Sequence, residues 1–429
     1  MFFSLEVENF RSIKERQALT FQRAGNGSES RLDLGSDTAG GDLTPVVVLF
    51  GANASGKSNV LDALKYVRAL VLGSADREVG KPLPVQTFRL DEKSREAPSS
   101  FRIRFSTAAH EYEYEVSLQD GIVVSEWLGE HVRNTTRRSV RTLFSRRVAD
   151  GKSAITVSAK LRGSKKAIID ATRDNMLFLS KAAKENFEPL MDAYHWFIPA
   201  DSSTDPVNLF DEDPKFCEWV LQLLGSADLG VSGIRIKPPS QRPPQELVKM
   251  LAEDDDSESL ADAEQRLMKA NRRPTLSHRA IVDGVLTAEE IPWNYESLGT
   301  RQLWEYAGGI YSALKNGTLL LLDEITGLHP LLLKEIIMLF QRKSTNPNGA
   351  QLLFSSHDVT LLGNWGGLGF LLDRDQIWFT EKGNDGITQL YPLTDFSPRS
   401  EENIEKLYLQ GRLGATPILG DLVREAPRE

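Results

Sequence analysis

The chain has 429 residues, of which 40% are hydrophobic, so it can form one large α/β domain or such a domain with a sizeable insertion. Its formal net charge of -9 argues against a protein that coats nucleic acid with its whole surface. No uncharged apolar run reaches about 18 residues, and acids at Glu6 and Glu8 precede any signal-peptide core, which predicts a cytoplasmic protein. The only cysteine, Cys217, excludes an internal disulfide, and we expect it to be a small buried hydrophobic residue.

The N-terminal part combines strand patterns with one helix. Residues 3–21 predict a β-hairpin, because apolar and polar residues alternate in the first strand, and 24–44 are rich in Gly, Ser and Asp, as loops are. PVVVLF at 45–50 predicts a buried parallel strand, and the apolar spacing in 60–73 predicts a helix. Period two returns in 99–147, which predicts an antiparallel meander.

The rest of the chain is first helical and then α/β. Residues 166–230 have helix-like patterns, and 237–275 are too polar and proline-rich for a core. We therefore expect a mobile insertion there, with one helix or a helical pair but no coiled-coil arm, because no heptad pattern persists. Further on, TLLLLDEI and AQLLFSSHD predict buried strands, LLLKEIIMLFQR a helix, and QIWFTEK a further strand.

Two halves of an α/β sheet thus flank an inserted middle. We expect an N-terminal lobe at 1–148, a mostly helical insertion at 149–280, and a C-terminal lobe at 281–429.

A glycine-rich loop carries the strongest motif. Residues 51–58, GANASGKS, match G-x-x-x-x-G-K-[ST] between a predicted strand and a predicted helix. Gly51 and Gly56 would let backbone N–H groups approach phosphate oxygens, Lys57 would neutralise the β- and γ-phosphates, and Ser58 would ligate Mg²⁺.

Two acids and a histidine follow two of the predicted buried strands. Asp323 could hold magnesium through water, and Glu324 could polarise an attacking water, although acids are also common where helices begin. His357 follows the strand LLFSS, where it could reach a γ-phosphate, although a lone histidine is often structural. We predict catalytic roles for Glu324 and His357 and a metal-binding role for Asp323.

A further anion site is suggested ahead of the acidic strand. Ser297 and Gly299 stand at a helix start, where backbone N–H groups and a donor side chain can bind an anion. An ordinary helix cap gives the same pattern. Its place between the glycine loop and the DE strand favours the functional interpretation.

The order of these motifs resembles that of ABC-type ATPases in the branch of SMC, Rad50 and RecF proteins. NFRSI near the start, Asn53 in the loop and DEITGLHP add to the likeness. More narrowly, the chain is similar to the AAA-type ATP-binding proteins of the RloA/AbiL group associated with phage defence, through DEITGLHPLLLKEI, NPNGAQLLFSSHD, RDQIWFTEK and NIEKLYLQGRLGATPIL. The resemblance covers roughly 1–148 and 281–419.

This resemblance implies an ABC-type ATPase head with a mixed sheet, an antiparallel β lobe and a helical insertion. It implies that two chains enclose two ATP molecules with Mg²⁺, each loop facing the partner chain's copy of Ser297 and Gly299, so that hydrolysis requires a homodimer or higher even oligomer. Gln86 is the candidate for the glutamine that contacts magnesium and the attacking water. One departure is that DEITGLHP lacks an acid before Thr326, which affects the expected loop after Glu324.

Three functions remain open. The leading hypothesis is an ATP-hydrolysing switch that controls a separate effector such as a nuclease or toxin. The alternative is a RecF-like DNA-binding repair ATPase that uses Arg133 to Lys166, which holds eleven Lys or Arg and only one acid. A self-contained nuclease using Asp373 and Asp375 is disfavoured, because only 72 residues follow His357.

Overall fold

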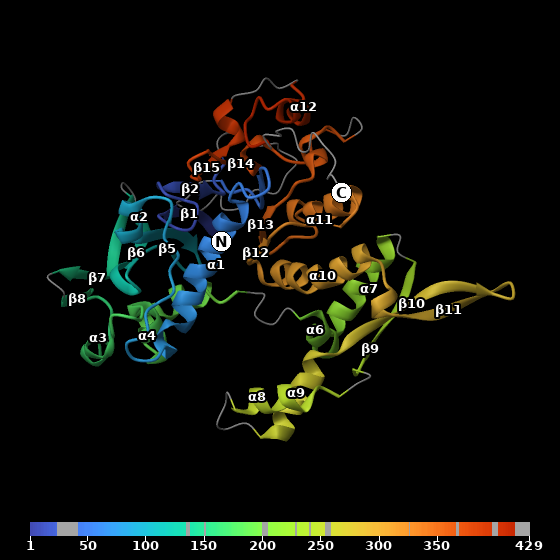
Figure 1. Cartoon of the computed structure of the whole chain (residues 1–429), viewed down its shortest axis with the longest axis horizontal. Coiled ribbons are helices and arrows are strands. Elements are labelled where there is room, and N and C mark those ends of the chain that lie inside the picture. The colour runs from blue at the N-terminus through green and yellow to red at the C-terminus, as the bar shows by residue number, and fades with distance from the viewer. Residues whose placement is uncertain are drawn as a thin grey trace, which may run out of the picture. The chain divides into compact units, whose positions relative to one another are not determined.

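The fold is taken from a computed structural model, which describes residues 1–23, 42–133, 138–149, 152–199, 205–227, 230–239, 242–253, 259–325, 327–365, 369–396 and 402–416 (Figure 1). The chain forms two compact units. Unit 1 comprises Met1–Ala200, Ala313–Thr326 and Leu333–Glu429, and unit 2 comprises Asp201–Ser312 and Gly327–Leu332. The two units are described separately below.

A seven-stranded antiparallel sheet forms one part of unit 1. Its order is β2-β1-β4-β5-β6-β7-β8. The strands are β1 (Phe2–Glu8), β2 (Gln17–Thr20), β4 (Ser99–Ser106), β5 (Glu111–Gln119), β6 (Ile122–Arg133), β7 (Arg138–Ala149) and β8 (Lys152–Val157). The predicted hairpin and meander are confirmed, and β8 extends the sheet beyond the predicted end of the meander.

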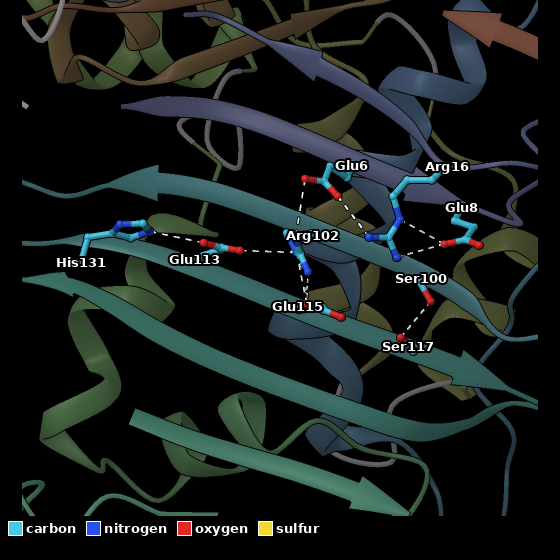
Figure 2. Close-up of polar contacts among 9 residues, drawn as sticks. All are labelled: Glu6, Glu8, Arg16, Ser100, Arg102, Glu113, Glu115, Ser117 and His131. Carbon is cyan, nitrogen blue, oxygen red and sulfur yellow. Dashed lines mark hydrogen bonds and ion pairs between the residues drawn. The ribbon is translucent and has the colours of Figure 1, made fainter. Parts of the chain in front are cut away.

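The outer face of this sheet carries a ladder of ion pairs, because polar residues occupy every second position (Figure 2). Arg102 on β4 lies 2.8 Å from Glu115 and 3.4 Å from Glu113. His131 on β6 lies 3.3 Å from Glu113, and Glu6 on β1 lies 3.7 Å from Arg102. Such cross-strand pairs between partly exposed groups contribute little individually, so this face is a polar surface that faces solvent.

A five-stranded sheet in unit 1 carries the glycine loop. Its order is β12-β13-β3-β14-β15, in which β12, β13, β3 and β14 run parallel and β15 is antiparallel to β14. The strands are β3 (Val46–Phe50), β12 (Leu319–Leu322), β13 (Gln351–Ser355), β14 (Ile377–Lys382) and β15 (Thr388–Pro392). The predicted strands are confirmed, and β15, which was not predicted, pairs with β14.

One hydrophobic core joins the two sheets through α1 (Lys57–Gly73). Val60, Leu64 and Val67 of α1 are fully buried together with apolar residues of β1, β3 and β4. At about 25 cal/mol per Å², burial of such side chains supplies the main favourable term in folding. The predicted helix after the glycine loop is confirmed.

The other helices of unit 1 cover sheet faces and connect strands. They are η1 (Ser74–Asp76), α2 (Glu92–Glu96), α3 (Lys166–Ala171), α4 (Phe178–Lys184), α5 (Glu188–Trp196), η4 (Val359–Leu362), η5 (Arg374–Gln376), η6 (Leu393–Phe396) and α12 (Ile404–Leu409). Helix α11 (Pro330–Gln341) lies mostly in unit 1, and its face with Ile336 and Ile337 is buried.

Unit 2 contains both helices and a sheet. Its elements are α6 (Pro206–Glu212), α7 (Pro214–Ser226), β9 (Val231–Lys237), α8 (Gln245–Glu253), α9 (Leu260–Ala270), β10 (Arg273–Val282), β11 (Val285–Pro292), η3 (Trp293–Tyr295) and most of α10 (Leu298–Asn316). Helices α8 and α9 contact each other, which is the second of the two expected arrangements, one helix or a helical pair. The antiparallel sheet β11-β10-β9 was not predicted; β10 and β11 form a local hairpin, while β9 pairs with β10 across a polar segment of about 35 residues. Cys217, expected to be buried, is only half-buried on α7.

The predicted domain limits at 148/149 and 280/281 do not coincide with the limits of the two units. Strand β8 and helices α3 to α5 continue unit 1 beyond residue 149, because β8 pairs with β7. Strand β10 crosses residue 280 and pairs with β11.

Candidate functional site

The glycine loop connects β3 to α1, as the motif requires. Strand β3 is buried along its whole length, which fixes the start of the loop at the carboxyl end of a parallel strand. Gly56 caps α1 with φ of 110°, a conformation in the left-handed region that glycine adopts without steric cost. The backbone N–H groups of the first turn of α1 therefore face the loop.

Two threonines of the β14–β15 hairpin pack against this loop and form hydrogen bonds with it. A Cβ on Gly51 would lie 2.4 Å from the carbonyl oxygen of Thr380, and one on Gly56 would lie 2.3 Å from Oγ1 of Thr388. Ser55 Oγ lies 2.6 Å from Thr380 Oγ1, and Thr388 Oγ1 donates a 2.8 Å hydrogen bond to the carbonyl of Ser55. Close packing against the hairpin, as well as the turn itself, thus demands glycine at both positions.

Lys57 is the only lysine of the loop, and it is almost fully buried. Its ammonium donates hydrogen bonds to the carbonyls of Gly51, at 2.8 Å, and Ala52, at 2.9 Å. Burial lowers the pKa of Lys57, while the carboxylates of Glu324 and Asp323 act in the opposite direction. An anionic ligand at the loop would relieve this desolvation by pairing with the ammonium.

The acidic pair follows β12 and is held by the neighbouring strand β13. Ser355 Oγ donates a 2.7 Å hydrogen bond to Asp323 and accepts one of 2.7 Å from the backbone N–H of Glu324. Glu324 has φ of 53°, a left-handed conformation that is uncommon for a residue with a Cβ. Strained backbone of this kind is frequent at functional sites.

His357 follows β13 and lies beside the second acid. Its Nε2 is 3.3 Å from Oε1 of Glu324. Burial lowers the pKa of His357, the nearby charge of Lys57 lowers it further, and Glu324 partly offsets both effects. A neutral imidazole beside a carboxylate can orient a proton donor or a water molecule.

These groups surround one cavity of about 490 Å³, which we call the loop hollow. It is lined by Asn53, Ala54, Ser55, Gly56, Lys57, Ser58, Asn59, Asp323, Glu324, Ser355, His357 and Lys382. The structure therefore brings together the predicted residues of the loop, the acidic pair and the histidine. The Ser58 hydroxyl and the Asp323 carboxylate are oxygen donors of the kind that Mg²⁺ prefers, so they fit that ion.

Gln86 lies at a neighbouring cavity of about 600 Å³, which we call the side hollow. The side hollow is lined by Arg11, Ser12, Asn59, Gln86, Thr87, Phe88, Arg89, Leu90, Lys382 and Gly386. The carbonyl of Gln86 accepts a 2.7 Å hydrogen bond from the N–H of Arg11, which fixes this backbone. Gln86 does not line the loop hollow, so its predicted roles at magnesium and water stay a proposal.

Ser297 and Gly299 lie at the start of α10, in unit 2. Ser297 Oγ accepts a 3.1 Å hydrogen bond from the N–H of Thr300, so the side chain caps the helix. A Cβ on Gly299 would lie 3.3 Å from the carbonyl of Gly327. Their predicted role toward a nucleotide of a partner chain stays a proposal. Thr326, which marks the shortened loop, is outside the described residues.

Sequence reasoning missed Ser355, Thr380, Thr388 and Lys382. The pair of serines before His357 was a weak signal for Ser355. The two threonines gave no signal, because more than 300 residues separate them from the loop that they support.

The basic stretch from Arg133 to Lys166 is partly structural. Arg146 is buried and donates to the carbonyl of Met176 and to Ser153, and Arg141 forms an ion pair with Glu130. Arg137 lies outside the described residues. The stretch therefore presents fewer free cations than its composition suggests.

Asp373 and Asp375 precede β14. The side chain of Asp373 forms a capping box with Gln376 around η5. This arrangement accounts for Asp373 as a turn residue.

The parallel strands, the glycine loop and the helix that follows it define an α/β protein of the P-loop class. The model of the family "AAA domain, putative AbiEii toxin, Type IV TA system" matches residues 46–198 and 234–363. The chain belongs to this family.

No curated protein sequence matches the chain. It is similar to a structure titled "Crystal structure of the SmcHead bound to the C-winged helix domain of ScpA", at 14% identity and a TM-score of 0.43, over 91% of this chain and 97% of that one. A structure of the SMC head domain from Thermotoga maritima gives 12% and 0.37, over 91% and 98%. These TM-scores are too low to bear on function. In the described part of the chain, no helix has the length and apolar character of a membrane span.

Proposed function

We propose that this protein is an ATPase of the ABC type that dimerises around ATP and Mg²⁺ and thereby controls a separate effector in anti-phage defence. The observation that carries the proposal is the meeting of Lys57, Asp323, Glu324 and His357 at the loop hollow. A cation for phosphates, an acid for a metal and an acid–imidazole pair for water are the parts that phosphoryl transfer to water requires.

Each residue has a distinct role in this proposal. Lys57 and the backbone N–H groups after Gly56 bind the β- and γ-phosphates, and Ser58 and Asp323 hold Mg²⁺, which neutralises phosphate charge when bound. Glu324 accepts a proton from the attacking water, and His357 orients that carboxylate or the γ-phosphate. The side hollow offers room beside the loop for the base and sugar.

The dimer and the effector rest on sequence resemblance. In the SMC, Rad50 and RecF branch, a serine and a glycine in the position of Ser297 and Gly299 complete the site of a partner chain. The likeness to the RloA/AbiL group and the family description, which names a toxin–antitoxin system, support a role in defence with a nuclease or toxin as effector.

Phosphate release from ATP by the purified protein, with and without Mg²⁺, tests the proposal directly. We expect Mg²⁺-dependent turnover and an increase in mass from monomer to dimer when ATP is present and hydrolysis is blocked. Absence of both binding and turnover would contradict the ATPase assignment. Turnover without a change in mass, measured by light scattering, would contradict the dimer alone.

A RecF-like DNA-binding ATPase is the second candidate, because Arg147, Lys160 and Arg162 of the basic stretch are exposed. Phosphate contacts give binding that weakens steeply with salt. If this candidate is correct, changing these three residues to Glu weakens binding to duplex DNA by about tenfold or more and leaves basal turnover intact. No DNA binding by the unaltered protein at low salt excludes it.

A further inference from the structure

Lys382 is a cation next to the glycine loop that none of the motifs includes. It is the last residue of β14, on the hairpin that supports Gly51 and Gly56, and its side chain is exposed. Among the hydrogen bonds and ion pairs of the described residues, none involves its ammonium. The neighbouring residue Glu381, in contrast, accepts a hydrogen bond from Tyr391. The ammonium of Lys382 is therefore available to a ligand.

Lys382 lies at the boundary between the loop hollow and the side hollow. Lys382 and Asn59 are the two residues that line both the loop hollow and the side hollow. The side-chain amide of Asn59 donates a 2.5 Å hydrogen bond to Ser12 Oγ, so it is already engaged. Asn59 is also neutral. Of the two residues at the boundary, Lys382 is therefore the one that carries a positive charge.

We infer that Lys382 is a second phosphate-binding cation of this site and contacts the α-phosphate of a bound nucleoside di- or triphosphate. The inference rests on the proposed function, because it takes the β- and γ-phosphates to lie at Lys57 and the base and sugar to lie in the side hollow. The α-phosphate joins these two parts of the ligand. It must then pass the boundary between the hollows, where Lys382 lies.

The exposed ammonium of Lys382 would compensate part of the negative charge of the bound polyphosphate. In the loop hollow, Lys57 already faces two carboxylates, so its single charge cannot balance a polyphosphate. A lysine at the boundary adds an attraction at short range, but ordering its long side chain costs entropy. We therefore expect a moderate contribution, about a tenfold change in affinity, which corresponds to about 1.4 kcal/mol.

The test compares two nucleotides and three variants. ATP and ADP affinities are measured by calorimetry for the unaltered protein, Lys382→Ala, Lys382→Arg and Lys343→Ala. Lys343 is an exposed lysine after α11 and serves as the matched control for loss of one charge. Equal melting temperatures exclude misfolding. We expect Lys382→Ala to weaken ATP and ADP by the same factor, about tenfold, with Lys382→Arg and Lys343→Ala close to the unaltered protein.

Each other outcome has a definite meaning. Unchanged affinities in Lys382→Ala show that the side chain only faces solvent, and a loss restricted to ATP places it at the γ-phosphate; both overturn the inference while leaving the proposed function intact. If the unaltered protein binds neither nucleotide, the proposed function itself fails.

Discussion

Oε1 of Glu324 lies 3.3 Å from Nε2 of His357 at the carboxyl ends of two adjacent parallel strands. Glu324 follows β12 and His357 follows β13, and Ser355 between them fixes the backbone of Glu324. The carboxylate and the imidazole can therefore act on the same water molecule.

Lys57→Ala should abolish ATP binding. Without the ammonium, the β- and γ-phosphates would be uncompensated in a loop next to two acids. Filter binding with labelled ATP measures the effect. An affinity equal to that of the unaltered protein would remove the basis for the phosphate site.

Glu324→Gln should retain ATP binding and lose turnover, because the amide keeps the shape of the side chain but cannot accept a proton. General-base loss typically costs about 10²- to 10⁴-fold in rate. Phosphate release under saturating ATP gives the rate, and light scattering shows whether an ATP-bound dimer accumulates. A variant that hydrolyses ATP at the normal rate would assign the base to another residue.

His357 should make the ligand-free protein less stable as the pH falls. Because the folded state lowers the pKa of His357, the unfolded chain binds the proton more readily. The loss therefore begins as the pH drops through the unfolded value of about 6.5 and is complete below the folded value. Melting temperatures between about pH 7.5 and 5.5 should fall more for the unaltered protein than for His357→Gln. Parallel curves would contradict this assignment.

Thr388→Val should weaken both the fold and ATP binding. The valine cannot donate to the carbonyl of Ser55 and loses the 2.7 Å contact with Ser12 Oγ, in a position that is fully buried. Leaving a buried partner unsatisfied costs about 1–3 kcal/mol. Urea unfolding and ATP affinity are the two measurements. Thr318→Val is the control, since the buried hydroxyl oxygen of Thr318 has no hydrogen-bond partner among the described residues. Equal effects of the two changes would mean that the loop does not depend on Thr388.

Arg146→Ala should destabilise the protein without involving a ligand. Burial raises the pKa of Glu126, and the charge of Arg146 partly offsets this effect inside the sheet. Arg146 also donates hydrogen bonds to the carbonyls of Met176 and Arg173, and leaving such buried acceptors without a donor costs about 1–3 kcal/mol. Lys152→Ala, at the exposed start of β8, should stay within about 0.5 kcal/mol in the same urea titration. A small loss of stability for Arg146→Ala would show that the buried contacts of this residue do not stabilise the fold.

The strands and helices around the glycine loop could be predicted from the sequence because their signals are local. A continuous apolar run marks β3, the G-x-x-x-x-G-K-S pattern marks the turn, and helical spacing of apolar residues marks α1. The positions of Asp323, Glu324 and His357 could be predicted for the same reason, since they come within two residues of the ends of buried strands, while their catalytic and metal-binding roles stay proposals.

Other features were decided only by the tertiary structure. The support of the loop by Thr380 and Thr388, the position of Lys382 between two hollows and the pairing of β9 with β10 all join residues that are distant in sequence. Such contacts depend on strand order and register, which no local pattern encodes. Arg146 illustrates the limit best: its sequence context is a basic surface, but the register of β7 turns its side chain into the core beside Glu126.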